Sequence, residues 1–156
     1  MKIKHFIVLA AAVFLAPELK AQVTNTDSAT VAKTFAQLLG ICKYIDFSDP
    51  NVTKLGTFYN AAPFIVYRGD DKKRAWKDFA DYTQADEKTG VDEICARINN
   101  TVNQDENYKI VGYSTETESE GTWYVLMVSY VKNGVAKKSA FAFLKINGRF
   151  ALGDID

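Results

Sequence analysis

From Trp123 onward, runs of aromatic and β-branched residues are separated by two Asn-Gly pairs, Asn133-Gly134 and Asn147-Gly148. Asn-Gly between two apolar runs indicates a type I′ hairpin turn, because both central residues of that turn need a positive φ. The pattern therefore predicts three antiparallel strands over residues 123–131, 135–146 and 149–155.

Two-residue loops at both turns fix which residues face each other across the strands. Across the first turn, Trp123 faces Leu144. Across the second turn, the same alternation pairs Ala142 with Gly153. Residues two apart along a strand share a face, so the two faces of the ribbon can be assigned.

Both faces of this ribbon are apolar, which excludes a sheet with one solvated side. Burying a large apolar side chain is worth roughly 1.5–3 kcal/mol, so about six left exposed would forfeit a domain's net stability of about 5–15 kcal/mol. We expect the chain's own helices on one face, and more sheet, a second subunit or a ligand on the other. The aromatic face carries Tyr124, Leu126, Val128, Tyr130, Phe141, Phe143, Phe150 and Leu152.

Two stretches before the ribbon have apolar residues at helical spacing. The first begins after a cap at Asp27 or Ser28, and the second after a capping-box-like pair, Thr89 and Asp92. The first stripe is Val31, Phe35, Leu38, Leu39, Cys42 and Ile45. The second stripe is Val91, Ile94, Cys95, Ile98 and Val102.

Between the two stripes the pattern is weaker. Residues 52–62 are ambiguous, with a short helix over Leu55, Phe58 and Tyr59 as one interpretation. Residues 64–67 predict a short strand. Asp70 or Asp71 then caps an expected helix that runs through Phe79. Residues 108–115 add a first strand to the meander, and helices followed by a meander are typical of an α+β fold.

Residues 1–21 have the pattern of a secretory signal peptide, with Lys2 and Lys4 before an apolar centre and Ala21 at the expected cleavage site. The apolar run is too short for a stable membrane span. We expect residues 22–156 to form one α+β domain that is periplasmic or secreted, with no stable membrane insertion after cleavage. An uncleaved anchor is the alternative.

Charge and histidine content exclude several classes of function. Cleavage of residues 1–21 would remove three of the 19 Lys and Arg residues and one of the 19 Asp and Glu residues. The remaining chain would have a net charge of about −2. No basic cluster suited to nucleic acid remains. The only histidine, His5, would be cleaved off as well. The processed chain therefore cannot form a histidine-based hydrolase site or a histidine-ligated zinc site. The sequence has no glycine-rich phosphate loop, and we expect no cofactor.

The order of elements resembles the nuclear transport factor 2-like (cystatin-like) superfamily. The resemblance is carried by the helix over residues 27–44, the long strands around Asn133-Gly134, and the closing stretch 145–152, which resembles the family's turn before a final aromatic-led strand. It implies N-terminal helices packed into a strongly curved, cone-like sheet, a pocket between sheet and helices, and homodimers through the sheet. The family contains both enzymes and non-catalytic binding modules, so the fold alone assigns no function.

Asp154 is the first candidate for chemistry, because the expected register places it beside Phe141 on the aromatic face. A desolvated carboxylate there would have a raised pKa and could accept a proton. The alternative is a solvated carboxylate near the chain end.

Aromatic residues with polar edges are the candidate ligand-binding groups, because they suit a largely apolar ligand. The alternative is that they belong to the core or to a dimer interface. Together with Asp154, the ligand-binding candidates are Trp76, Tyr113, Trp123, Tyr124 and Tyr130.

Cys42 and Cys95 each lie on an apolar helical stripe. In an exported protein they can form a disulfide, which would stabilise the chain by roughly 4 kcal/mol. The alternative is two buried free thiols. Their wide spacing fits neither a redox pair nor a zinc site, and we expect no metal site.

The hypothesis that follows is an exported, non-catalytic, homodimeric module that binds a small apolar ligand or a protein partner. The alternative is a cofactor-independent isomerase- or dehydratase-like enzyme, with Asp154 as the base and Tyr124 or Tyr130 as the donor to a developing oxyanion. An enclosed cavity that contains a desolvated carboxylate would favour the enzyme, and a cavity of similar size without one would favour the binding module.

Overall fold

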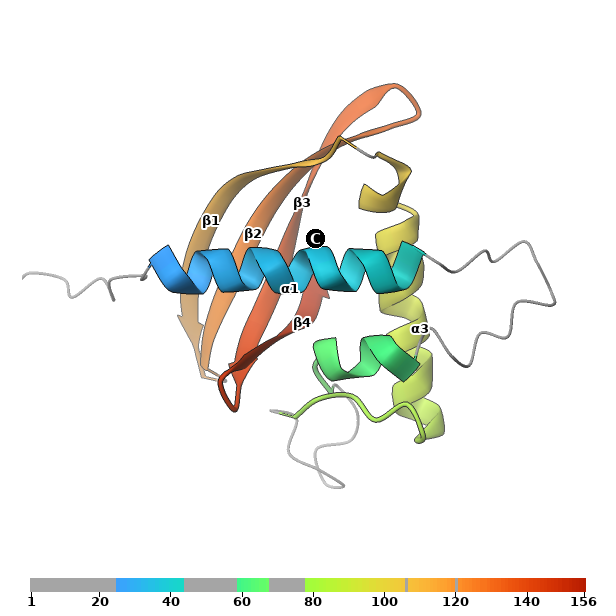
Figure 1. The fold of residues 1–156 in the computed structure, drawn as a ribbon, viewed down its shortest axis with the longest axis vertical. Coiled ribbons are helices and arrows are strands. Elements are labelled where there is room, and N and C mark those ends of the chain that lie inside the picture. The colour runs from blue at the N-terminus through green and yellow to red at the C-terminus, as the bar shows by residue number, and fades with distance from the viewer. Residues whose placement is uncertain (1–24, 44–58, 68–77, 106, 120) are drawn as a thin grey trace, which may run out of the picture.

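The chain folds as helices packed on a four-stranded antiparallel sheet, in a computed structural model that describes residues 25–43, 59–67, 78–105, 107–119 and 121–156. Its elements are α1 (Asn25–Lys43), the 3-10 helix η1 (Ala62–Phe64), α3 (Ala85–Asn99), the 3-10 helix η2 (Val102–Gln104), β1 (Lys109–Glu118), β2 (Gly121–Lys132), β3 (Val135–Ile146) and β4 (Arg149–Ile155). The strands lie in the order β1-β2-β3-β4 (Figure 1). The predicted α+β class is confirmed. The sheet is not strongly curled, however, so the expected cone-like curvature does not form.

Both predicted hairpin turns are present. Asn133 and Asn147 have φ values of 53° and 48°, and the glycines that follow them have φ values of 76° and 79°. These left-handed conformations are the ones that a type I′ turn requires. The predicted register across the first turn is also confirmed, from Trp123 opposite Leu144 to Val131 opposite Ala136.

The predicted register across the second turn is wrong beyond Leu152. The pairing shifts by one residue at Gly153, so Ala142 pairs with Asp154 rather than with Gly153. A side chain at Gly153 could not be accommodated here, because a Cβ atom would lie 2.6 Å from Cζ3 of Trp123. Glycine in a strand often marks such a bulge or close approach. The bulge turns Asp154 away from the aromatic face, which corrects its predicted place beside Phe141.

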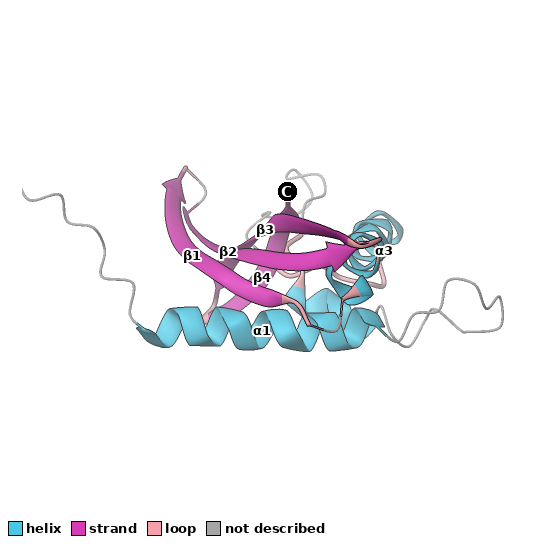
Figure 2. Ribbon diagram, turned by 90° about the horizontal axis from the view of Figure 1, so that it is seen from above, coloured by secondary structure: helices cyan, strands magenta, loops and turns pink. Residues whose placement is uncertain are grey.

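The aromatic face of the sheet, called the inner face below, is covered by α1 (Figures 1 and 2). The ring of Phe35 lies 4.7 Å from that of Phe141 and 6.4 Å from that of Phe143, measured between centroids. The predicted stripe is confirmed over the described part of α1, and its buried members are Val31, Phe35, Leu38, Leu39 and Cys42. Ile45 lies outside the described residues. Within the described chain, no helix is long and apolar enough to cross a membrane.

The second predicted helix exists, but it begins at Ala85 rather than at Thr89. Thr89 lies inside α3, where its hydroxyl donates to the carbonyl of Ala85 at 3.1 Å. Asp86 and Glu87 occupy the first turn, where carboxylates interact favourably with the helix dipole. The Thr89–Asp92 spacing therefore placed the predicted start of this helix one turn too late.

A disulfide joins Cys42 of α1 to Cys95 of α3, with Cα atoms 5.1 Å apart. The predicted disulfide is present, and the alternative of two free thiols is excluded. Next to the disulfide, the side-chain amide of Asn99 donates to the carbonyl of Cys42 at 2.9 Å. The two helices are thus held together covalently and by a hydrogen bond.

Residues 65–67 and 78–80 form a small two-stranded ribbon, called the cross-ribbon below. Val66 pairs with Phe79, and Ile65 pairs in parallel with Leu152 of β4. The predicted short strand at residues 64–67 is confirmed in part, since Phe64 belongs to η1. The predicted helix through Phe79 is wrong at that residue, because Phe79 is extended and paired.

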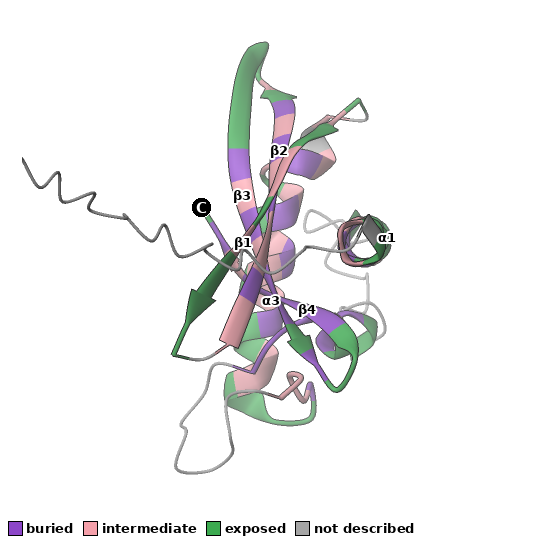
Figure 3. Cartoon of the chain, turned by 90° about the vertical axis from the view of Figure 1, so that its left-hand side faces the viewer, coloured by how far each residue is buried: buried purple, intermediate pink, exposed green. Residues whose placement is uncertain are grey.

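The cross-ribbon covers only one end of the outer face of the sheet. Val66 and Phe79 pack there with Trp123 and Leu144 in a second apolar cluster. Toward the β2–β3 turn none of the described helices or strands covers the outer face, and Val131 is 46% exposed (Figure 3). In this part the described residues of the single chain do not themselves provide the cover that we expected for the second face. Its outer residues include Ala136, Ala140 and Ala142, which bury little area, so exposing them costs little.

Candidate functional site

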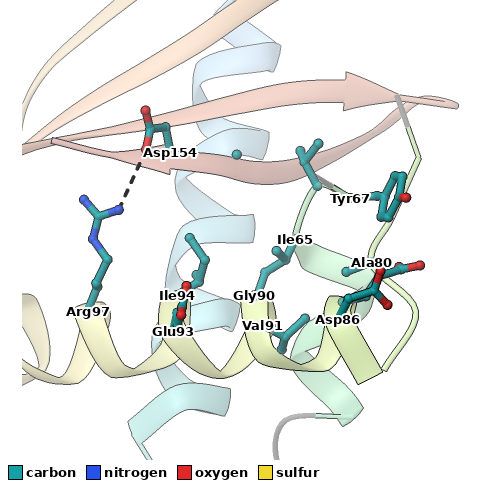
Figure 4. A pocket seen from close by; sticks show the side chains of 13 residues that line it. Ile65, Tyr67, Ala80, Asp86, Gly90, Val91, Glu93, Ile94, Arg97 and Asp154 are labelled. Atoms are coloured by element: carbon teal, nitrogen blue, oxygen red, sulfur yellow. Dashed lines mark ion pairs between the residues drawn. The ribbon is translucent and has the colours of Figure 1, made fainter. Parts of the chain in front are cut away.

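A surface hollow of about 300 Å³, called the α3–β4 groove below, lies between α3, the cross-ribbon and the end of β4 (Figure 4). Its apolar lining comes from Ile65, Val66, Ala80, Val91 and Ile94. Its charged lining comes from Asp86, Glu87, Glu93, Arg97 and Asp154.

Arg97 and Asp154 face each other at one end of the groove (Figure 4). Nη1 of Arg97 lies 3.8 Å from Oδ1 of Asp154, and Nη2 of Arg97 donates to the backbone carbonyl of Ile155. The two charged side chains are 51% and 41% exposed, so their ion pair is worth only about 0–1 kcal/mol. Its role is geometric, because Arg97 ties the end of β4 to α3.

Gly90 keeps the middle of the groove open. It lies in α3 and lines the groove, and a Cβ atom built on it would have no neighbour within 4 Å. Its φ is not in the left-handed region, so the backbone does not require glycine here. A larger side chain at residue 90 would therefore point into free space.

The structure brings Asp154 into the groove but separates it from the predicted donors. Asp154 pairs with Ala142, so both residues lie on the outer face of the sheet. Tyr124 and Tyr130 lie on the inner face. A joint cavity of Asp154 with either tyrosine does not form. The physical reason is the bulge at Gly153, which reverses the side of the sheet that Asp154 faces.

The other predicted ligand-binding residues are dispersed. Trp123 is buried on the outer face beside Gly153. Tyr130 is buried at the other end of the inner face, where its hydroxyl lies 3.1 Å from that of Ser139. Tyr113 lies on the inner face of β1, and Trp76 is outside the described residues.

Tyr113 and Tyr124 do come together, near the start of α1. Burial, together with smaller contributions from the nearby Asp27 carboxylate and Tyr124, raises the pKa of Tyr113 to about 12. A hydrogen bond from Nζ of Lys145 to Asp27, at 2.9 Å, raises the pKa of Lys145. Within the described part of the chain, the buried hydroxyl of Tyr113 has no hydrogen-bond partner. This cluster fixes the start of α1 on the sheet.

The groove residues on α3 were missed in the sequence, although a signal for them exists. Asp86, Gly90, Glu93 and Arg97 are spaced by four, three and four residues, so they form one stripe on α3. That stripe is polar and lies beside the apolar one, as on any amphipathic surface helix. Only the neighbouring cross-ribbon and β4 make it the wall of a groove.

The described residues contain no group of three or more His, Cys, Asp or Glu side chains placed to hold a metal ion. Comparison of the chain with models of protein families, with curated proteins and with solved structures found no match.

Proposed function

We propose that this chain is an exported, non-catalytic module that binds a small, largely apolar ligand in the α3–β4 groove. The observation that carries the proposal is a hollow of about 300 Å³, left open by Gly90, in which an apolar wall meets charged side chains. Ligand sites usually have volumes of about 300–1,000 Å³, apolar walls and a few polar groups, so this groove fits a small guest. Arg97 and Asp154 would orient the polar end of that guest.

Two features support export. Residues 1–21, which lie outside the described residues, have the pattern of a signal peptide. The disulfide between Cys42 and Cys95 is of the kind that persists in oxidising compartments. We therefore place the protein in the periplasm or outside the cell.

The relation to the nuclear transport factor 2-like superfamily is likewise a proposal. The order of elements, helices before a four-stranded meander, supports it. The weak curvature of the sheet speaks against a deep cone, and the α3–β4 groove is lined by no residue of α1. We therefore place the ligand in the groove rather than between α1 and the sheet.

The enzyme alternative is less well supported. It needs Asp154 and Tyr124 or Tyr130 on one cavity, and these residues lie on opposite faces of the sheet. Of the carboxylates that line the groove, the proposed base Asp154 already pairs with the guanidinium of Arg97.

Binding of Nile red, a neutral apolar dye whose fluorescence rises in apolar surroundings, tests the proposal. We expect saturable binding to the wild-type chain. Gly90→Leu would add an isobutyl group at the groove, where a built Cβ atom has no neighbour within 4 Å. It should weaken binding by about tenfold or more, since a displaced guest loses most of its apolar contact.

Gly40→Leu is the matched control. Gly40 is also an exposed helical glycine with no neighbour within 4 Å of a built Cβ atom, but it lies on α1, away from the groove. Gly40→Leu should bind the dye as the wild type does. An equal loss in both variants, or wild-type affinity in Gly90→Leu, would refute the groove as the binding site.

A further inference from the structure

The β2–β3 hairpin extends beyond its neighbouring strands as a two-stranded projection, called the hairpin arm below and made of residues 130–138 (Figure 1). The pairing of β1 with β2 reaches only as far as Ser129. On the other side, the last contact of β3 with the end of the chain is at Ala140, which exchanges two backbone hydrogen bonds of 2.9 Å with Asp156. Among the described residues, the arm therefore has no strand beside it. A two-stranded hairpin is marginally stable in water, so a partner that covers it is expected.

The arm exposes large apolar side chains on both of its faces. Val131 lies on the outer face and is 46% exposed, whereas Val135 lies on the inner face and is 53% exposed. Both flank the Asn133-Gly134 turn at the tip. A flat partner that docked on one face would leave the other valine in water. A lipid bilayer surrounds whatever enters it, so it can bury both valines at once.

Exposed lysines follow the valines toward the body of the molecule. Lys137 and Lys138 are neighbours on β3, so they point to opposite faces. Lys109 and Lys138 both pair with Ser129, from its two sides, so they share the outer face. At about 3.4 Å per residue, Lys137 and Lys138 lie about 7–10 Å behind Val135 along the strand. Apolar groups of surface-bound proteins reach about 5–10 Å into the boundary of headgroups and acyl chains, so the lysines would lie level with the phosphates.

The other charged groups at the arm are compatible with such a contact. Nζ of Lys132 donates to the backbone carbonyl of Asn100, so the charge of this tip residue is directed back toward the body of the molecule. A lysine near a bilayer behaves in this way when its stem lies along apolar surface and its ammonium group stays in water. Asp105 accepts a hydrogen bond from the backbone N–H of Val131 at 2.8 Å. The lysines of the region outnumber this carboxylate, so the arm is basic.

We propose that the hairpin arm docks this protein on the surface of a lipid bilayer with anionic headgroups. Val131 and Val135 enter the boundary between headgroups and acyl chains, and the three exposed lysines (Lys109, Lys137 and Lys138) lie against the phosphates. The contact is peripheral, because only the tip of the arm enters the bilayer.

Local charge selects an anionic surface as the partner. The chain without residues 1–21 has a net charge of about −2, so its overall charge does not attract it to such a surface. Attraction falls off within about 8 Å at physiological ionic strength, so the residues nearest the bilayer decide the interaction. Each lysine close to an anionic bilayer strengthens binding severalfold. The basic arm therefore orients the molecule tip first.

Co-flotation of the processed chain with lipid vesicles tests this inference. We expect saturable binding to vesicles of phosphatidylcholine and phosphatidylglycerol in a two-to-one ratio, and much weaker binding to phosphatidylcholine alone. Added salt should weaken the binding, because the lysines are exposed. Equal binding to the two kinds of vesicle, or no binding to either, would overturn the inference.

Two double variants separate the roles of charge and of apolar contact. Lys137→Gln with Lys138→Gln should weaken binding to the anionic vesicles by about tenfold or more, because two cations leave the bilayer surface. Val131→Thr with Val135→Thr keeps the shape and the strand preference of both side chains and exchanges a methyl group for a hydroxyl in each. It should weaken binding by about tenfold, since less apolar surface leaves water.

Lys33→Gln with Lys88→Gln is the matched control for charge. This variant loses the same two charges, but from α1 and from the first half of α3, which begins at the end of the molecule opposite the arm (Figure 1). It should bind the vesicles as the wild type does. An equal loss in this control, or undiminished binding in either arm variant, would contradict docking through the arm.

The hairpin arm and the α3–β4 groove are separate surfaces, since the groove is lined by α3, the cross-ribbon and β4. A chain that floats with anionic vesicles but does not bind Nile red in their absence would refute only the proposed function. A chain that binds the dye but does not float with the vesicles would refute only the bilayer contact.

Discussion

At the scale of single residues, buried Tyr82 and half-buried Tyr113 differ in how their hydroxyl groups are satisfied. The hydroxyl of Tyr82 donates to Oδ1 of Asp92 at 3.0 Å, whereas that of Tyr113 has no partner among the described residues. A buried hydroxyl without a hydrogen bond costs about 1–3 kcal/mol. The two positions therefore predict opposite responses to the same chemical change.

Tyr113→Phe should raise the free energy of unfolding by about 1 kcal/mol, because it removes an unsatisfied hydroxyl. Tyr82→Phe should lower it by about 1–2 kcal/mol, because it breaks a bond to a charged group. Urea unfolding of the two variants and the wild type measures both changes. Equal destabilisation by the two substitutions would show that the Tyr113 hydroxyl has a partner.

At the scale of elements, the glycines of the two helices and of β4 have different reasons to be glycine. Gly40 and Gly90 lie in helices with free space where a Cβ atom would be, whereas Gly153 is approached by the indole ring of Trp123. Glycine inside a helix costs about 1 kcal/mol relative to alanine. Replacing Gly40 or Gly90 by alanine should therefore recover this free energy, whereas replacing Gly153 should not.

Gly40→Ala and Gly90→Ala should each raise the free energy of unfolding by about 0.5–1 kcal/mol. Gly153→Ala should lower it by about 1–3 kcal/mol, because the ring of Trp123 must move. Thermal unfolding followed by circular dichroism compares the three. A neutral Gly153→Ala variant would show that the bulge does not depend on this contact.

The sequence predicted those elements whose signals are local. The Asn133 and Asn147 turns, the register they impose as far as Leu152, and the apolar stripe of α1 depend only on neighbouring residues, and all three are confirmed. The bulge at Gly153 lies under the ring of Trp123, which reaches across from β2, and no pattern within β4 alone could reveal that contact.

The candidate site was harder to predict than the fold for the same reason. Asp154 was identified, but its partner Arg97 comes from a helix that is distant in the sequence. Phe79 was assigned to a helix because its spacing from Trp76 is helical, whereas pairing with Val66 holds it extended. Each miss involves a contact between segments that are separated along the chain.

At the scale of the whole molecule, the disulfide connects the helix that covers the inner face to the helix that forms the groove. Cys42 and Cys95 are separated by 53 residues. Closing a loop of that size removes conformational entropy from the unfolded chain that is worth about 4 kcal/mol.

Replacing both cysteines by serine should therefore lower the free energy of unfolding by about 3–4 kcal/mol. Urea unfolding of the wild type, with and without a reducing agent, provides the matched comparison. The reduced wild type should lose nearly as much stability as the double variant. An unchanged unfolding midpoint after complete reduction would contradict the expected contribution of this bond.

The central claim is that a guest binds between α3 and β4 and not between α1 and the sheet. Titration of the isotope-labelled chain with Nile red, followed by amide chemical shifts in nuclear magnetic resonance, locates the guest directly. The largest shifts should fall at Gly90, Ile94 and Gly153. Largest shifts at Phe35 and Phe141 on the inner face, or no saturable shifts at all, would contradict the account.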